Sequence, residues 1–74
     1  MERDARAWLR ERLGELIGEE AAAVGGGEDL REHGLDSVRA FQLATLLRRE
    51  RPGLEFADIA ERLTVDGLAE LLEG

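Results

Sequence analysis

The sequence predicts an all-α fold, a bundle of three longer helices and one short helix with a long first loop. Apolar residues recur at the three- and four-residue spacing of helices, and no stretch alternates convincingly with period two. The glycine cluster and the only proline fall between the periodic stretches, where they interrupt helices. A length of 74 residues suits one small apolar core, so residues 1–74 are expected to form a single domain.

The first helix is predicted at the N-terminus, with Asp4 as its cap. Its apolar face comprises Ala5, Leu9, Leu13, Leu16 and Ile17. Trp8 lies at the edge of this face and is expected to pack partly against a neighbouring segment rather than to mark a ligand site. Three consecutive glycines, at 25–27, then disfavour a helix, and an irregular loop is predicted as far as Gly34, with Leu30 as its apolar anchor.

A second helix is predicted from Asp36 or Ser37, either of which can cap it, to about Glu50. A proline-glycine pair shortly afterwards prevents its continuation. The core-facing stripe of this helix comprises Ala40, Leu43, Ala44 and Leu47. Val38 and Phe41 fall on a different side of the helical wheel, so the core does not require them.

The last third of the chain contains two helical patterns. Residues 56–63 predict a short helix, and Thr64 is placed to cap a final one. The apolar face of the final helix comprises Val65, Leu68, Ala69 and Leu72. These segments complete the predicted bundle.

Composition excludes several classes of function. Seventeen acidic residues against ten basic ones give a net charge of −7, which disfavours binding to nucleic acid. The absence of cysteine removes disulfides, thiolate nucleophiles and cysteine-based zinc sites, and favours a reducing compartment such as the cytoplasm. No apolar run approaches the roughly 20 residues of a membrane span, and no signal-peptide pattern is present, so no membrane association is expected.

Few side chains could carry covalent chemistry. Ser37 is the only serine and His33 the only histidine, and lysine and tyrosine are absent. A Ser/His/Asp hydrolase is disfavoured because the Gly-x-Ser-x-Gly turn is missing. One histidine among scattered carboxylates has no metal-ligand spacing, so His33 is interpreted as an exposed loop residue. The sequence therefore predicts neither a catalytic residue nor a metal site.

Ser37 lies at the start of a predicted helix, after Gly34, Leu35 and Asp36. Unpaired amides and the positive end of the helix dipole stabilise an anion there, so a phosphodiester on the serine oxygen would be well placed. The alternative is that Ser37 serves only as a helix cap. Spacing alone favours the cap.

Two longer motifs favour cofactor attachment at Ser37 over a capping role alone. They read Glu28-Asp29-Leu30 followed by His33-Gly34-Leu35-Asp36-Ser37-Val38-Arg39, and Leu63-Thr64-Val65-Asp66-Gly67-Leu68-Ala69. Together they resemble the attachment motif and the closing helix of the phosphopantetheine carrier protein family, over essentially the whole chain. The usual proline before the threonine of the closing helix is replaced by Leu63. The resemblance implies a four-helix carrier-protein bundle in which Ser37 bears 4'-phosphopantetheine, and in which Asp36 presents the serine to the modifying enzyme and its metal.

The resemblance also implies partners. A phosphopantetheinyl transferase would move the arm from coenzyme A to Ser37, and an adenylating, acyl-activating enzyme would load an aryl or amino acid onto the thiol of the arm. A condensation enzyme or another downstream enzyme would then take the acyl group. The carrier itself would catalyse nothing and is expected to be a monomer. Val38, Phe41, Phe56 and Ala60 are predicted to form the partner-binding surface.

The subclass is predicted from the residues around the attachment serine. Fatty-acid-type carriers have a strongly acidic second helix, whereas this chain carries Gln42, Arg48 and Arg49 there. Residues 34–39 and 54–60 look more like the aryl carrier domains of siderophore-type nonribosomal peptide synthesis. A polyketide or fatty acyl carrier and a cofactor-free helical interaction module remain as alternatives. A helix-turn-helix DNA binder would have the wrong net charge.

Overall fold

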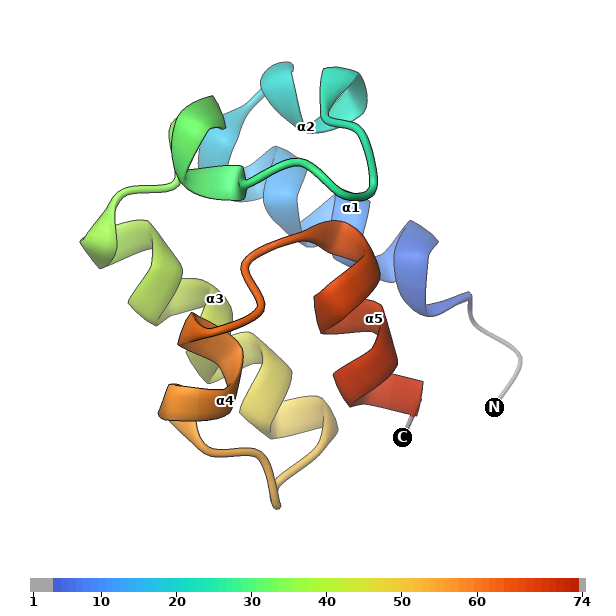
Figure 1. Ribbon diagram of the computed structural model, residues 1–74, viewed down its shortest axis with the longest axis vertical. Coiled ribbons are helices and arrows are strands. Elements are labelled where there is room, and N and C mark those ends of the chain that lie inside the picture. The colour runs from blue at the N-terminus through green and yellow to red at the C-terminus, as the bar shows by residue number, and fades with distance from the viewer. Residues whose placement is uncertain (1–3, 74) are drawn as a thin grey trace.

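The fold is all-helical, as predicted (Figure 1). The computed structural model describes residues 4–73, and these contain no strand. In chain order the elements are α1 (Ala5–Ile17), α2 (Glu20–Ala23), the 3-10 turn η1 (Leu30–His33), α3 (Ser37–Glu50), α4 (Phe56–Ala60) and α5 (Val65–Glu73). Within the same range no helix is long and apolar enough to cross a bilayer.

The core lies where α1 packs against α5, α2 and α3, while α4 covers α3 from another side (Figure 1). The four residues predicted as the inner stripe of α3 are all buried, which confirms the orientation of that helix. The largest fully buried side chains are Leu9, Leu13, Leu30, Leu35, Leu43, Leu47, Ile59, Leu68 and Val65. Every element except α2 contributes to that set, so a single core holds the bundle together.

The first helix begins and ends for local reasons. Asp4 caps α1 as predicted, because its carboxylate accepts a hydrogen bond from the Arg6 amide at 3.0 Å. The helix ends at Gly18, whose φ of 71° is one that other residues rarely adopt. Trp8 packs into the bundle, as expected, but more completely than its place at the edge of the apolar face predicted: its side chain is only 4% exposed and belongs to the core.

The first connection is long, as predicted, but it is not irregular throughout. It contains α2 and η1, which the glycine-rich composition concealed. The Arg10 guanidinium donates to the carbonyl oxygens of Ala21 and Val24, at 3.0 and 2.9 Å, and both of these residues bury their side chains. Asp29 caps η1 by accepting from the Arg31 amide. These contacts order the connection that leads to Ser37.

The short helix is shorter than predicted. It was expected to reach Leu63 but ends at Ala60. Leu63 lies outside the helix, where its side chain is buried and its carbonyl accepts from the Leu30 amide at 2.9 Å. This contact joins the segment after α4 to the first connection, a pairing that helical periodicity does not reveal. Thr64 caps α5 as predicted, because its hydroxyl accepts from the Gly67 amide at 2.9 Å.

Candidate cofactor attachment site

Ser37 is the first residue of α3, and its side chain is exposed. The cap of the helix is Asp36, whose Oδ1 accepts from the Arg39 amide at 2.8 Å. Among residues 4–73 no hydrogen bond engages the Ser37 hydroxyl. The alternative that Ser37 serves as the cap is therefore wrong, and its hydroxyl is left for other chemistry.

The turn before Ser37 is fixed from both sides. Gly34 takes a φ of 100°, which suits glycine, and Leu35 anchors the next position because its side chain is buried. Arg39 donates from Nη1 to the Asp36 carboxylate at 2.7 Å and from Nε to the Leu16 carbonyl at 2.8 Å. This arginine thus ties the attachment turn to the end of α1. That role of Arg39 was not predicted, although the three-residue spacing from Asp36 to Arg39 is typical of an ion pair on a helix.

A shallow groove of about 380 Å³ opens beside the serine. Its lining residues come from η1, the attachment turn, α3 and the region of α4: Arg31, Leu35, Asp36, Ser37, Ala40, Phe56, Ala60 and Leu63. Four of the six predicted site residues therefore lie around one groove. Its walls are mostly apolar. The contributions of Leu35 and Leu63 were not predicted, because a sequence pattern does not show which apolar side chains line a surface groove.

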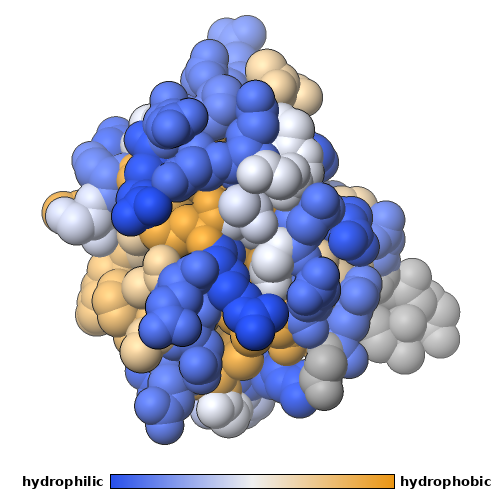
Figure 2. Space-filling model, in the orientation of Figure 1, coloured by the Kyte–Doolittle hydropathy of each residue, from blue (hydrophilic) through white to orange (hydrophobic). Residues whose placement is uncertain are grey.

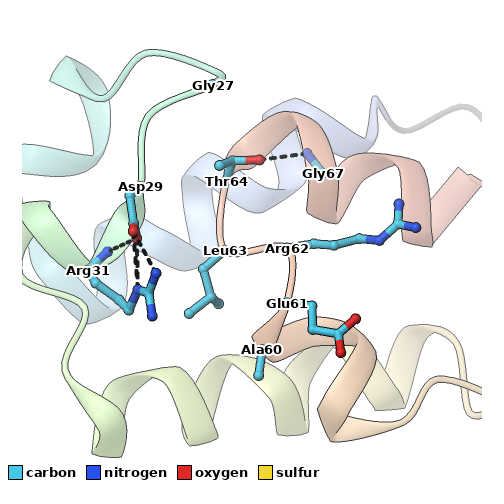
Figure 3. Close-up of a pocket in the computed structure, with 9 residues that line it drawn as sticks. All are labelled: Gly27, Asp29, Arg31, Ala60, Glu61, Arg62, Leu63, Thr64 and Gly67. Atoms are coloured by element: carbon cyan, nitrogen blue, oxygen red, sulfur yellow. Dashed lines mark hydrogen bonds and ion pairs between the residues drawn. The ribbon is translucent and has the colours of Figure 1, made fainter.

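A second hollow, of about 340 Å³, lies between η1 and the start of α5 (Figure 3). It shares Arg31, Ala60 and Leu63 with the groove beside Ser37. The Arg31 guanidinium bonds to Asp29 at 2.7 Å, and this interaction lowers the pKa of the Asp29 carboxyl to about 2. Arg31 thus lines both hollows, and its charge is paired with Asp29.

The aromatic side chains near the serine lie together. The rings of Phe41 and Phe56 are 5.9 Å apart between centroids and inclined at 50°, which joins α3 to α4. Phe41 is 63% exposed and Val38, one turn earlier on α3, is 66% exposed. Figure 2 shows the corresponding apolar surface at the left of the molecule, over α4 and the first half of α3. The structure thus brings Phe41, Phe56 and Ala60 to the side of the bundle on which Ser37 opens.

His33 differs from the sequence interpretation. Its side chain is only 21% exposed, because its ring lies between two carboxylates. Nδ1 is 3.1 Å from Glu20, and Nε2 is 3.3 Å from Glu28. The hydrogen bond to Glu20 is the main cause that raises the pKa of His33. The histidine thus links η1 to α2 and the glycine loop.

The chain matches a known protein family over nearly its whole length. The family described as "Phosphopantetheine attachment site" matches residues 7–72. The chain belongs to this family. Its members attach 4'-phosphopantetheine, so the cofactor predicted from the sequence is confirmed at the level of the family.

Several curated proteins resemble the chain. Polyketide synthase ThaQ of Burkholderia thailandensis is 38% identical over 72 residues, 97% of this chain. Phenyloxazoline synthase MbtB of Mycolicibacterium paratuberculosis is 39% identical over 64 residues, 86% of this chain, and pyochelin synthetase PchE of Pseudomonas aeruginosa is 39% identical over 70 residues, 90% of this chain. The chain spans only 4%, 6% and 5% of these proteins, respectively. No solved structure matches it significantly.

The residues of this family member suit a covalent phosphate ester at Ser37. The hydroxyl is exposed and free of hydrogen bonds within the described residues, and it stands at the amino end of a 14-residue helix. The amides and dipole at that end favour negative charge. The adjoining groove is mostly apolar and open, which leaves room for a flexible arm.

Proposed function

We propose that the chain is a carrier domain that is phosphopantetheinylated on Ser37 and holds an aryl or aminoacyl group as a thioester for transfer between biosynthetic enzymes. The observation that carries this proposal is the free, exposed hydroxyl at the first residue of α3, inside a chain of the phosphopantetheine attachment family. When bound, the arm supplies the thiol that this cysteine-free chain lacks.

Each residue of the attachment turn has a defined task in this proposal. The Ser37 oxygen forms the bond to phosphorus, and the amides at the start of α3 face the negative charge of the phosphate. Asp36 fixes the helix start and presents the serine to the transferase and its metal. Arg39 holds Asp36 in place through both the backbone amide and the guanidinium. The chain acts as a carrier rather than as an enzyme.

The partner-binding surface in this proposal comprises Val38, Phe41, Phe56 and Ala60, all of them exposed. Phe56 and Ala60 line the groove beside Ser37, and Phe41 lies against Phe56. Exposed aromatic side chains beside an attachment point are the kind of anchor that contributes most to interface energy. The phosphopantetheinyl transferase, the adenylating enzyme and a condensation or other downstream enzyme would use this surface in turn.

The acyl group is proposed to be aryl or aminoacyl. The chain is similar to phenyloxazoline synthase, whose name denotes a product with a phenyl group, and this similarity supports an aryl group. Positions 37–49, which form most of α3, contain no acidic residue. Enzymes that recognise an acidic helix, as the partners of fatty-acid-type carriers do, would therefore fit this chain poorly. A polyketide carrier is the second candidate, and the 38% identity to polyketide synthase ThaQ favours it.

A two-step loading assay tests the proposal. The chain is first incubated with coenzyme A and a transferase of broad specificity, and intact-mass spectrometry should show the gain of one arm. The loaded protein is then offered either to an aryl-activating or amino-acid-activating adenylating enzyme, or to an acyltransferase with malonyl-coenzyme A.

Gain of an aryl or aminoacyl mass on the arm supports the proposal, and Ser37→Ala serves as the unloaded control. Gain of malonyl alone would identify a polyketide carrier. Failure to gain the arm at all would contradict the carrier function and leave the cofactor-free interaction module.

A further inference from the structure

The guanidinium of Arg39 contacts two separate parts of the fold. Nη1 donates to Asp36 Oδ2 at 2.7 Å, just before the start of α3. Nε donates to the carbonyl oxygen of Leu16 at 2.8 Å, which lies 23 positions earlier in the chain. Within the described residues no other hydrogen bond joins α1 to α3. Arg39 therefore bridges the turn that carries Ser37 and the end of the first helix.

The end of α1 has a physical need for this bridge. Leu16 lies in the last turn of α1, where carbonyl oxygens lack partners within the helix and the negative end of the helix dipole lies. The last turn contains no basic residue of its own. The Arg39 guanidinium brings both an N–H donor and a positive charge to this end. Arg39 thus supplies from α3 what the sequence of α1 lacks.

The bridge crosses an open part of the surface. A hollow of about 330 Å³ lies between the end of α1 and the attachment turn, and its lining residues are Leu16, Ile17, Glu20, His33, Gly34 and Arg39. A side chain built at Gly34 would have its nearest neighbours in Ile17, at 3.9 Å, so the turn does not press closely on α1 here. The Arg39 bonds are therefore not backed by close packing between these two segments.

The bridge is separable from the helix cap. Asp36 Oδ1 accepts from the backbone amide of Arg39, and this bond would remain with another side chain at position 39. Only the bonds to Asp36 Oδ2 and to the Leu16 carbonyl belong to the guanidinium. The Arg39 side chain is 46% exposed, and an ion pair with this exposure contributes little to global stability. Helix capping and stability therefore leave the second contact, with α1, unexplained.

We infer that Arg39 is a positioning residue for arm attachment, which holds the turn before α3 against the end of α1 so that the Ser37 hydroxyl keeps one direction. The inference rests on the proposed carrier function. In the attachment step the Ser37 oxygen forms a bond to the phosphorus of the arm. The bond from that phosphorus to the nucleotide half of coenzyme A breaks, the nucleotide leaves with the electron pair, and the hydroxyl proton passes to a base of the transferase.

The inference predicts which kinetic constant changes. Attack on phosphorus requires the hydroxyl at a defined distance and direction, and a turn that samples several arrangements meets this requirement less often. The loss should therefore appear in kcat. Val38 and Phe41 project from α3 itself and remain available, so binding of the carrier, and hence KM, should be retained.

The test measures steady-state arm transfer to the unloaded chain, with coenzyme A and a transferase of broad specificity. Arg39→Gln removes the guanidinium and keeps the backbone amide. Arg6→Gln is the matched control, because it removes the same charge from a side chain that is 45% exposed and whose Nε joins α1 to Asp66 of α5 at 3.0 Å. Arg39→Lys keeps the charge without the planar pair of donors. Thermal unfolding and amide hydrogen exchange at residues 35–38 are measured on each protein.

Arg39→Gln should lower kcat for arm transfer roughly 3- to 10-fold, the range of one lost hydrogen bond, with KM for the carrier within about twofold of wild type. Its amides at residues 35–38 should exchange faster than those of wild type. Arg6→Gln should match wild type in both measurements, and Arg39→Lys should recover only part of the rate. Both glutamine variants should unfold within roughly 8 °C of wild type.

Four results would overturn the positioning role and leave the carrier function standing. They are an unchanged kcat in Arg39→Gln, a rise in KM alone, an equal loss of kcat in Arg6→Gln, and full recovery in Arg39→Lys, which would assign the effect to charge. A wild-type chain that gains no arm would instead contradict the carrier function itself.

Discussion

Replacement of Phe41 by alanine separates a docking role from a core role for the aromatic pair. Phe41 is 63% exposed, so only about a third of its side chain leaves water on folding. Full burial of a phenylalanine contributes about 1.5–3 kcal/mol, and a third of this is about 0.5–1 kcal/mol. Loss of the tilted contact with Phe56 adds about 0.5 kcal/mol, the lower end for such pairs, because both rings are exposed.

The total of about 1–1.5 kcal/mol corresponds to a fall in melting temperature of roughly 4–12 °C for a domain of this size. If Phe41 anchors partner enzymes, the same substitution should slow acyl transfer by roughly 30-fold, the effect of a hot-spot residue of about 2 kcal/mol. Thermal unfolding by circular dichroism and loading by the adenylating enzyme, measured on the folded protein, give the two values. A much larger loss of stability with normal transfer would show that Phe41 is a core residue and refute the docking role.

Three further predictions concern stability. Leu47→Ala removes a fully buried side chain from the inner face of α3 and should cost about 2–5 kcal/mol, so a melting temperature within a degree or two of wild type would contradict the assignment of that face. The ion pair with Arg31 lowers the pKa of Asp29 to about 2. The ionised Asp29 therefore adds to the free energy of unfolding above the unfolded pKa of about 3.9, and this contribution is lost as pH falls toward 2. In Asp29→Asn, the free energy of unfolding should fall less steeply than in wild type between about pH 4 and pH 2. The hydrogen bond to Glu20 raises the pKa of His33. The protonated His33 therefore adds to the free energy of unfolding below the unfolded pKa of about 6.5, and this contribution is lost as pH rises through the pKa of the folded state. Denaturant titrations from about pH 6 to 8 should show a smaller loss of stability for His33→Gln than for wild type.

The longer helices were predictable from the sequence. Burial of one helix face places apolar residues at three- and four-residue spacing, and this spacing is visible in a single sequence. The start of α1 follows from the capping aspartate, the end of α3 from the proline-glycine pair, and the inner stripe of α3 from apolar spacing. The early end of α4 could not be predicted in this way. Leu63 lies beyond that end, where its carbonyl accepts a hydrogen bond from the Leu30 amide, and the two residues are 33 positions apart in the sequence.

The candidate site could be predicted from the sequence only in part. Ser37 stands out as the candidate attachment residue because it is the only serine and lies in a family motif. The sequence could not decide between Asp36 and Ser37 as the helix cap, because both residue types cap helices well. The position of His33 between Glu20 and Glu28 also depends on the path of the first connection, where α2 and η1 are too short to show a period.

The attachment of the arm to Ser37 is the central claim, and fragment-ion mapping of the loaded protein tests it most directly. After incubation with coenzyme A and a transferase, the wild-type chain should carry the added mass on the peptide that contains Ser37. The Ser37→Ala protein, folded to the same extent, should gain none. Added mass on Thr45 or Thr64, or full modification of the Ser37→Ala protein, would contradict the account.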